Sequence, residues 1–467
     1  MILLETLSLR IWEGELTVQD ALELRELLGD EVIQLRQSGH DLDGALLRVQ
    51  EALASGGRGW LPEFERAYDE LEEARVEPGW PYAEPSDLQE ILATLGDDDD
   101  AALRGPSGEV LRDRVHAAWL GRCVGCNLGK PVEGLGWNRE KLRRYLEQAG
   151  SYPITDYLPV LDPMPAGMVL DESWRVTTRG RVNGMARDDD TDYTILGLHI
   201  LEEHGFGFTT AQVGAEWLLH LPFGQTYTAE RVAYRNLVRG IAPPHTARYR
   251  NPYREWIGAL IRADAFGYAC PGQPRRAALL AYRDAALSHT ANGIYGEMWA
   301  AALTAASFAV PTAREALDIA MAAVPPASRL AEALRAVHVA FDSGLSWDKA
   351  MDQVERDLGG YHWIHTVNNA AVVAAALLWG EGDFTKSIGL AVAAGLDTDS
   401  DGATAGSVFG ALHGTAALPA HWVDPLRDTI HSAIADFDSY SISGLAERTV
   451  ALARTGAGDI AGGDAGD

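Results

Sequence analysis

The sequence predicts an all-α fold, with a compact helical main domain and a small helical N-terminal appendage. Ala and Leu dominate from Arg112 onward, and the alternation of Val, Ile and aromatic residues that is typical of strands is scarce. Ala-rich stretches begin at Glu297 (EMWAAALTAASFA) and at Asn368 (NNAAVVAAALLW), and such stretches suit buried helices. We therefore expect the main domain to be nearly all helix.

The chain divides into three segments. Its 467 residues exceed the usual length of one domain. Up to about residue 75 the pattern is helical, and Thr17 and Asp20 resemble a capping box. The segment PGWPYAEP and the acidic run 97–100, which follow, are typical of loops. That run could bind a cation, but a solvated linker is the favoured interpretation. We expect an appendage with linker over 1–105, a main domain over 106–450 and a disordered tail over 451–467.

Composition indicates a globular enzyme of a reducing compartment. Hydrophobic residues make up 47% and charged residues 23%, and the net charge of −28 argues against a surface that binds nucleic acid. Three cysteines cannot all pair, and Cys123 and Cys126 are expected to be buried small residues despite their C-x-x-C spacing. No basic leader precedes an apolar run, and no apolar stretch reaches the ~18 residues that span a bilayer. We expect a cytoplasmic location without a membrane partner.

Two acidic clusters stand out. Asp188-Asp189-Asp190-Thr191-Asp192 opens a helical pattern that stops at Gly205, and three adjacent carboxylates are favourable in a fold chiefly when a cation compensates them. Asp397-Thr398-Asp399-Ser400-Asp401-Gly402 begins like a calcium loop, but Val408 stands where an EF-hand needs Glu. Glycines at 402, 406 and 410 then form a stripe that lets a helix approach a neighbour closely. This second cluster should thus lie in a packed core, where unpaired carboxylates are costly.

The candidate ligands indicate the metal. All are oxygen donors, which suit Mg²⁺ or Mn²⁺, and two clusters far apart in sequence suggest two ions that share one site. The alternative for each cluster is a plain acidic helix cap. The predicted metal ligands are Asp188, Asp189, Asp190, Asp397, Asp399 and Ser400.

From about Leu111 to Asp436 the chain resembles the ADP-ribosylglycohydrolases, which include the dinitrogenase reductase-activating glycohydrolases and certain jellyfish lens crystallins. Five motifs in family order carry the resemblance: GRCVGCNLGKPVEG, ARDDDTDYTILGL, HTANGIYGEMWAAA, IHTVNNAAVVAAALLWGEGDF and AAGLDTDSDGATAGSVFGALHG. It implies an all-α fold with two central Mg²⁺ or Mn²⁺ ions, and cleavage of ADP-ribose from a modified side chain. The family's metal motifs fall on Asp188–Thr191 and on Asp397, Asp399 and Ser400, and Glu133 falls on the acid that ends the first Gly-rich loop, near the ribose.

The chain departs from the family pattern at three places. Asp188 replaces the usual Thr and adds a negative charge to the metal site, and Cys126 stands where many members carry Asp. The segment with Tyr295, Glu297 and Trp299 indicates a divergent branch. Release of ADP-ribose from arginine is therefore not carried over to this chain.

Cleavage at an anomeric carbon needs a positioned water, a base that activates it and groups that bind the sugar. Glu133 is the candidate that contacts the ribose and assists proton transfer, with a helix-capping Glu as the alternative. Asp189 or Asp399 could instead orient the water while binding metal. The lone histidines are more often core or pocket-wall residues. The candidate substrate-binding residues are Gly129, Glu133, His289, Asn292, Tyr295, Glu297, His365 and Asn368.

The expected function is a binuclear-metal glycohydrolase that cleaves a ribosyl bond in an ADP-ribosylated protein or a small ribosyl metabolite. One alternative is an N-glycosidase that acts on a free nucleoside or nucleotide-like metabolite. Another is a non-catalytic descendant that binds a ligand, against which the complete acidic clusters argue. The leaving group, the anomeric configuration, the oligomeric state and the role of the appendage stay open.

Overall fold

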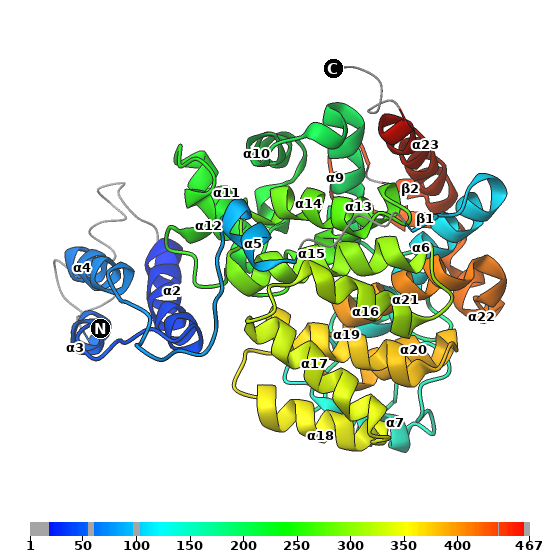
Figure 1. Cartoon of the computed structure of the whole chain (residues 1–467). Helices are drawn as coiled ribbons and strands as arrows, with labels where there is room; N and C mark the ends of the chain where they lie inside the picture. The colour runs from blue at the N-terminus through cyan, green and yellow to red at the C-terminus, as the bar shows by residue number, and fades with distance from the viewer. Residues whose placement is uncertain (1–17, 55–59, 97–102, 438, 462–467) are drawn as a thin grey trace.

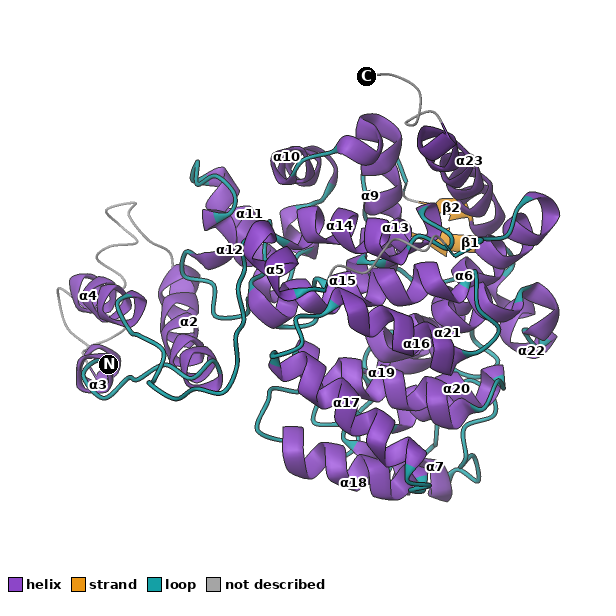
Figure 2. Ribbon diagram, viewed as in Figure 1, coloured by secondary structure: helices purple, strands orange, loops and turns teal. Residues whose placement is uncertain are grey.

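The computed structural model describes residues 18–54, 60–96, 103–437 and 439–461. In these residues the only sheet is an antiparallel pair, β1 (Thr429–His431) and β2 (Ser439–Ser441), with Ile430 opposite Tyr440. The other regular elements are helices, joined by turns and loops (Figures 1 and 2). The predicted all-α fold is confirmed. Within the described residues, no helix combines the length and the apolar character needed to cross a membrane.

The main body is a bundle of α-helices joined by short 3₁₀ turns. Its α-helices are α5 (Leu88–Thr94), α6 (Gly108–Gly129), α7 (Arg139–Gln148), α8 (Trp174–Thr177), α9 (Asp189–His204), α10 (Thr210–His220), α11 (Thr228–Val238), α12 (His245–Arg248), α13 (Asp264–Ala269), α14 (Pro274–Ala285), α15 (Ala291–Ser307), α16 (Ala313–Ala320), α17 (Arg329–Asp342), α18 (Trp347–Leu358), α19 (Thr366–Gly380), α20 (Phe384–Ala393), α21 (Thr398–His413), α22 (Ala420–Val423) and α23 (Ile442–Ala461). The 3₁₀ turns are η1 (Lys130–Val132), η2 (Gly205–Gly207), η3 (Phe223–Gln225), η4 (Leu260–Arg262), η5 (Met321–Ala323), η6 (Thr415–Ala417) and η7 (Asp424–Leu426).

Helices α6 and α21 lie backbone to backbone in the centre of this body. A Cβ atom on Gly125 would overlap the carbonyl of Gly402, and one on Gly406 would overlap the carbonyl of Gly121. Because only glycine lets two helix backbones come this close, the stripe that begins at Gly402 is where the structure needs it. The predicted close approach is confirmed, and it places the start of α21 inside the core.

The two helices with acidic starts begin and end as their residues require. Asp188 caps α9, and its side chain accepts a hydrogen bond from the backbone N–H of Asp190 at 2.9 Å. The helix ends at Gly205, whose φ of +64° suits glycine, as the sequence predicts. Asp397 precedes α21, and Gly414 ends it with a φ of +77°.

The appendage is a separate helical layer beside the main body (Figure 1). Helices α2 (Val18–Gln37), α3 (Leu46–Ala54) and α4 (Trp60–Glu72) enclose a small core of their own, which includes Leu28 and Phe64 and touches Val232 of α11. A cavity of about 880 Å³ lies between this layer and the main body. Thr17 and the acidic run 97–100 lie outside the described residues.

At both ends of the predicted main domain, the neighbouring segment packs on the core. The segment before residue 105 packs on the main body, since Ile91 of α5 belongs to the main core and the Ala83 N–H donates to the Ala327 carbonyl at 2.9 Å. At the other end, α23 continues to Ala461, so residues 451–461 are helical instead of disordered. Val450 and Ala453 are buried against the core, and this packing holds the helix past the predicted boundary. Residues 462–467 lie outside the described residues.

Candidate metal centre

The structure brings the two acidic clusters together at the meeting point of three helix ends. The cluster at Asp188–Asp190 opens α9, Asp397 and Asp399 open α21, and Glu133 follows η1 at the end of α6. One group of candidate ligand atoms comes from Cys126, Asp188, Asp190 and Asp399, and a second comes from Glu133, Asp397 and Asp399. Within each group the atoms lie within 4.8 Å of one another. Asp399 belongs to both groups, so the two groups are adjacent.

Ser400 joins the clusters directly. Its Oγ lies 3.1 Å from Asp190 Oδ2 and 2.9 Å from Asp397 Oδ2, so one hydroxyl is within hydrogen-bond distance of both helix starts. Five of the six predicted metal ligands thus converge. Asp189, the first residue of α9, belongs to neither of the two ligand groups found in the described residues.

Two buried residues that sequence reasoning missed hold these helix starts in place. Arg122 of α6 donates to the Asp190 carbonyl from Nη2 at 2.6 Å and to Asp264 Oδ2 from Nη1 at 2.7 Å. Asn369 of α19 accepts a hydrogen bond from the Asp397 N–H at 3.1 Å. Arg122 stands in the first motif and Asn369 in the fourth, but the sequence does not reveal their roles, because the partners of Arg122 lie 68 and 142 residues away.

Burial makes these carboxylates resist ionisation. Burial and then the charge of Asp399 raise the pKa values of Glu133 and Asp190 well above the usual range. The pKa of Asp397 is raised for the same two reasons, and burial with the charge of Asp188 raises that of Asp189 to about 8. Carboxylates that repel one another in a buried site are the groups that a divalent cation stabilises. The donor set therefore fits one or two hard cations.

Lys130 and Cys126 change the charge and the donors of this site. The Lys130 ammonium forms an ion pair with Asp188, and although burial opposes ionisation, this ammonium lowers the pKa of Asp188. Burial and the neighbouring aspartates raise the pKa of the Cys126 thiol well above its usual value, so the thiol stays protonated. Neither effect could be predicted from spacing alone, since both depend on the convergence of α6 with α9 and α21.

Gly129 acts through its backbone. A Cβ atom on Gly129 would overlap the Thr398 carbonyl, and Thr398 Oγ1 donates to the Gly129 carbonyl at 2.9 Å. Gly129 thereby lets the end of α6 lie against the start of α21, next to Glu133. Beyond it, the ring of Trp363 lies beside Gly134, so an indole borders the loop after Glu133.

Four of the predicted substrate-binding residues make their polar contacts in other networks. Asn292 Nδ2 donates to Glu84 Oε1 at 2.8 Å, and Tyr295 donates to the Pro85 carbonyl. Glu297 Oε2 lies 3.5 Å from Arg262 Nη2, and His289 is fully buried near Glu230, with 3.8 Å between Nε2 and Oε1. The substrate-binding role of these four residues stays a prediction.

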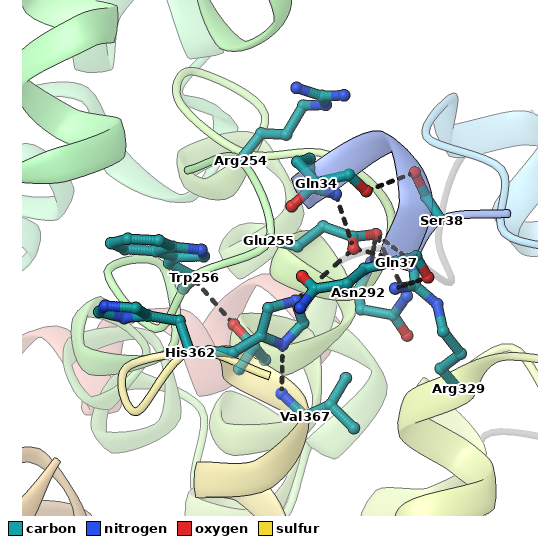
Figure 3. A network of polar contacts seen from close by, with 12 residues as sticks. Gln34, Gln37, Ser38, Arg254, Glu255, Trp256, Asn292, Arg329, His362 and Val367 are labelled. Carbon is teal, nitrogen blue, oxygen red and sulfur yellow. Dashed lines mark hydrogen bonds and ion pairs between the residues drawn. The ribbon is translucent and has the colours of Figure 1, made fainter. Parts of the chain in front are cut away.

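His365 and Asn368 start α19. His365 Nδ1 accepts a hydrogen bond from the Val367 N–H at 3.2 Å, and its Nε2 lies 3.7 Å from Glu255 Oε2. Figure 3 shows Glu255 at the centre of a polar network that reaches Gln34, Asn292 and Arg329. Asn368 accepts from the Asn369 N–H at 3.1 Å, and this contact places it next to the residue that binds Asp397.

The arrangement supports metal-assisted hydrolysis. Carboxylate oxygens at the starts of α9 and α21 lie close enough to share hard cations, and burial and the charge of Asp399 raise the pKa of Glu133 next to them. A bound cation with a nearby carboxyl that gives and takes a proton is a combination that can activate a water molecule and protonate a leaving group.

Comparisons with known proteins bear on the same region. The family model described as ADP-ribosylglycohydrolase matches residues 107–457. A solved structure described as an ADP-ribosylglycohydrolase-related protein complex is similar over 74% of this chain and 99% of its own, with 20% identity and a TM-score of 0.44. Among curated proteins no sequence matches the chain.

Proposed function

The chain belongs to the ADP-ribosylglycohydrolase family, and on that premise we propose that it is a divalent-metal-dependent glycohydrolase that cleaves a bond at the anomeric carbon of a ribose. Its proposed substrate is an ADP-ribosylated protein or a related ribosyl metabolite. The observation that carries this proposal is the position of Asp399, which takes part in two adjacent groups of candidate ligands.

The proposed cofactor is a pair of Mg²⁺ ions, with Mn²⁺ as the close substitute. Asp188, Asp190 and Asp399 would hold one ion, and Asp397 and Asp399 the other, with Glu133 next to them and with Ser400 Oγ joining the two helix starts. When bound, the ions supply positive charge that lowers the pKa of water and attracts ribose hydroxyls. Asp189 keeps its proposed role beside the site, where it orients water.

Glu133 is the residue that transfers protons in the proposed reaction. Hydrolysis adds water across the glycosidic bond, so the leaving group must gain a proton and the attacking water must lose one. The pKa of Glu133 is raised by burial and by Asp399, and a raised pKa suits a carboxyl to act as a general acid. Trp363, beside the loop that follows Glu133, is the candidate to stack on a base of the substrate.

The test is hydrolysis of a panel of ADP-ribosylated proteins, ADP-ribosylated amino acids and free nucleosides with and without Mg²⁺ or Mn²⁺. We expect turnover that chelation removes, and loss of turnover in Asp399→Asn. Asp348→Asn, at an exposed position on α18, is the matched control and should keep full activity. Full activity of the chelated protein, or of Asp399→Asn, would contradict the metal-dependent mechanism.

The same panel separates the candidate functions. Release of ADP-ribose identifies the proposed activity, release of a base from a free nucleoside identifies an N-glycosidase, and binding without turnover identifies a non-catalytic descendant. We also propose that the protein works in the cytoplasm. The support is that Cys123, Cys126 and Cys270 are buried free thiols, which a reducing compartment preserves.

A further inference from the structure

A second cluster of metal-ligating side chains lies on α9 and α10, two helices that pack together at one end of the main body (Figure 1). His199 comes from α9, and Glu216 and His220 come from successive turns of α10. Since an α-helix rises ~1.5 Å per residue, His199 lies ~15 Å along α9 from the carboxylates at its start. The cluster is therefore separate from the proposed catalytic centre.

The distances in this cluster match a metal shell. His199 Nε2 and His220 Nε2 lie 3.2 and 3.3 Å from the same oxygen, Glu216 Oε2. Two ligands bonded to zinc at ~2.0–2.1 Å in tetrahedral geometry are themselves about 3.3 Å apart. All three ligand atoms lie within 4.8 Å of one another, so one ion can reach them together.

A chain of hydrogen bonds fixes the orientation of Glu216. The Thr209 N–H donates to Gln212 Oε1 at 2.9 Å, which identifies the Gln212 nitrogen as the atom 3.1 Å from His204 Nδ1. Because that amide nitrogen can only donate, His204 Nδ1 accepts, and its Nε2 carries the proton that it donates to Glu216 Oε1 at 2.8 Å. One carboxylate oxygen is thus occupied, and the other faces His199 and His220. Outer hydrogen bonds of this kind orient metal ligands in proteins.

The two histidines are packed so that their Nε2 atoms converge. Their rings meet edge to face at a centroid distance of 4.5 Å. Their side chains are 13% and 20% exposed, so an ion from solvent can reach them. In the part of the chain that the structure describes, the buried Nδ1 of His220 has no hydrogen-bond partner.

We propose that His199, Glu216 and His220 bind one divalent transition-metal ion of the zinc class, with water in the remaining position. Two imidazoles with one carboxylate suit zinc, whereas the carboxylate and hydroxyl ligands proposed for the catalytic centre suit Mg²⁺ or Mn²⁺, so the two sites should prefer different metals. An ion here also links α9 to α10, and it should raise the melting temperature of the protein because it binds only the folded state.

The test is calorimetric titration of the full chain with Zn²⁺ in the presence of saturating Mg²⁺, which competes at the carboxylate centre. We expect one equivalent of Zn²⁺ to bind the parent and not the His199→Ala/His220→Ala variant. Asp397→Ala should keep that equivalent, because it alters only the other site. His421→Ala removes an exposed histidine and serves as the matched control.

Thermal melts give the second measurement. Zn²⁺ should raise the melting temperature of the parent and of His421→Ala, and should leave the double variant unchanged. If the double variant does not fold, His220→Gln replaces it, since Gln is a smaller change at this partly exposed end of α10, and it should lose the same equivalent. Undiminished Zn²⁺ binding by either variant, or a parent that binds no Zn²⁺ under these conditions, would overturn the proposal.

Discussion

Lys130→Met tests whether the protein's own ammonium competes with a cation for the carboxylate centre. The Lys130 ammonium pairs with Asp188, one of the proposed metal ligands. Met keeps most of the side-chain volume and removes the charge. We expect Lys130→Met to bind Mg²⁺ more tightly than the parent and to melt at a lower temperature when metal-free, because a buried carboxylate that loses its partner is destabilising.

The size of the effect follows from the charges. At an effective dielectric constant of ~20, a unit charge and a divalent ion ~5 Å apart repel by roughly 7 kcal/mol. The Lys130 side chain is 16% exposed, so it can turn toward solvent when an ion binds and relieve most of this repulsion. The expected gain in Mg²⁺ affinity is therefore roughly 10- to 100-fold, which is about 1.4 to 2.8 kcal/mol.

Two measurements check this prediction. Calorimetric titration with Mg²⁺ gives the affinity, and thermal melts with and without Mg²⁺ give the two stabilities. Lys386→Met removes a lysine that pairs with Glu381 at the surface, and this control should leave the Mg²⁺ affinity unchanged. Equal or weaker Mg²⁺ binding by Lys130→Met would refute the competition and would make Lys130 part of the binding site.

Three further predictions follow from the same structure. Glu133→Gln should lower turnover by about 100-fold or more, since it removes one positioned acid-base group, and steady-state kinetics check this; a rate near that of the parent would move the proton transfer to Asp189. Metal-free protein should lose stability as pH rises from 3.8 toward about 8, because the raised pKa of Asp189 keeps a proton on the folded state that the unfolded state has released. Melts across this range should show that slope, and saturating Mg²⁺ should flatten it. Deleting residues 1–75 should leave a main domain that melts cooperatively in a calorimeter.

Local patterns predicted much of the fold and part of the candidate site. The glycine stripe from Gly402 predicted a close helix crossing, because the absence of a side chain is readable from sequence and has few other uses in a helix. The acids at Asp190 and Asp397 were recognisable because runs of carboxylates need compensation. Lys130 lies in the first motif, but the sequence does not show that its charge pairs with Asp188, which is 58 residues away. Contacts between residues far apart in the chain produce no periodic pattern in the sequence, so they could not be predicted from it.

The tail that the sequence predicts to be disordered shows the converse failure. Residues from 451 onward are small and rich in Gly and Ala, which favours disorder when each residue is judged by itself. In the structure Leu445, Val450 and Ala453 are buried on one face of α23, and this packing outweighs the low content of large side chains. Tertiary burial, which a local pattern does not contain, decided the outcome.

The contacts between the appendage and the main body indicate that the main body should fold after residues 1–75 are deleted. Arg329 is held by Glu84 and Glu255, each at 2.7 Å, and all three residues remain after residues 1–75 are deleted. The deletion takes from Glu255 the hydrogen bond that Gln34 donates at 2.9 Å, and from Arg329 the Gln37 carbonyl that accepts at 2.9 Å. Arg254 loses its ion pair with Glu31 at 2.8 Å, so among the described residues it is the one charged group of this network left to find solvent. The cleft of about 880 Å³ between the two parts, which is already open to solvent, would lose one of its walls. Since the carboxylate centre is built from α6, α9 and α21, the truncated protein should bind Mg²⁺ with the parent's stoichiometry, and an aggregated product or lost binding would show that the appendage completes the main core.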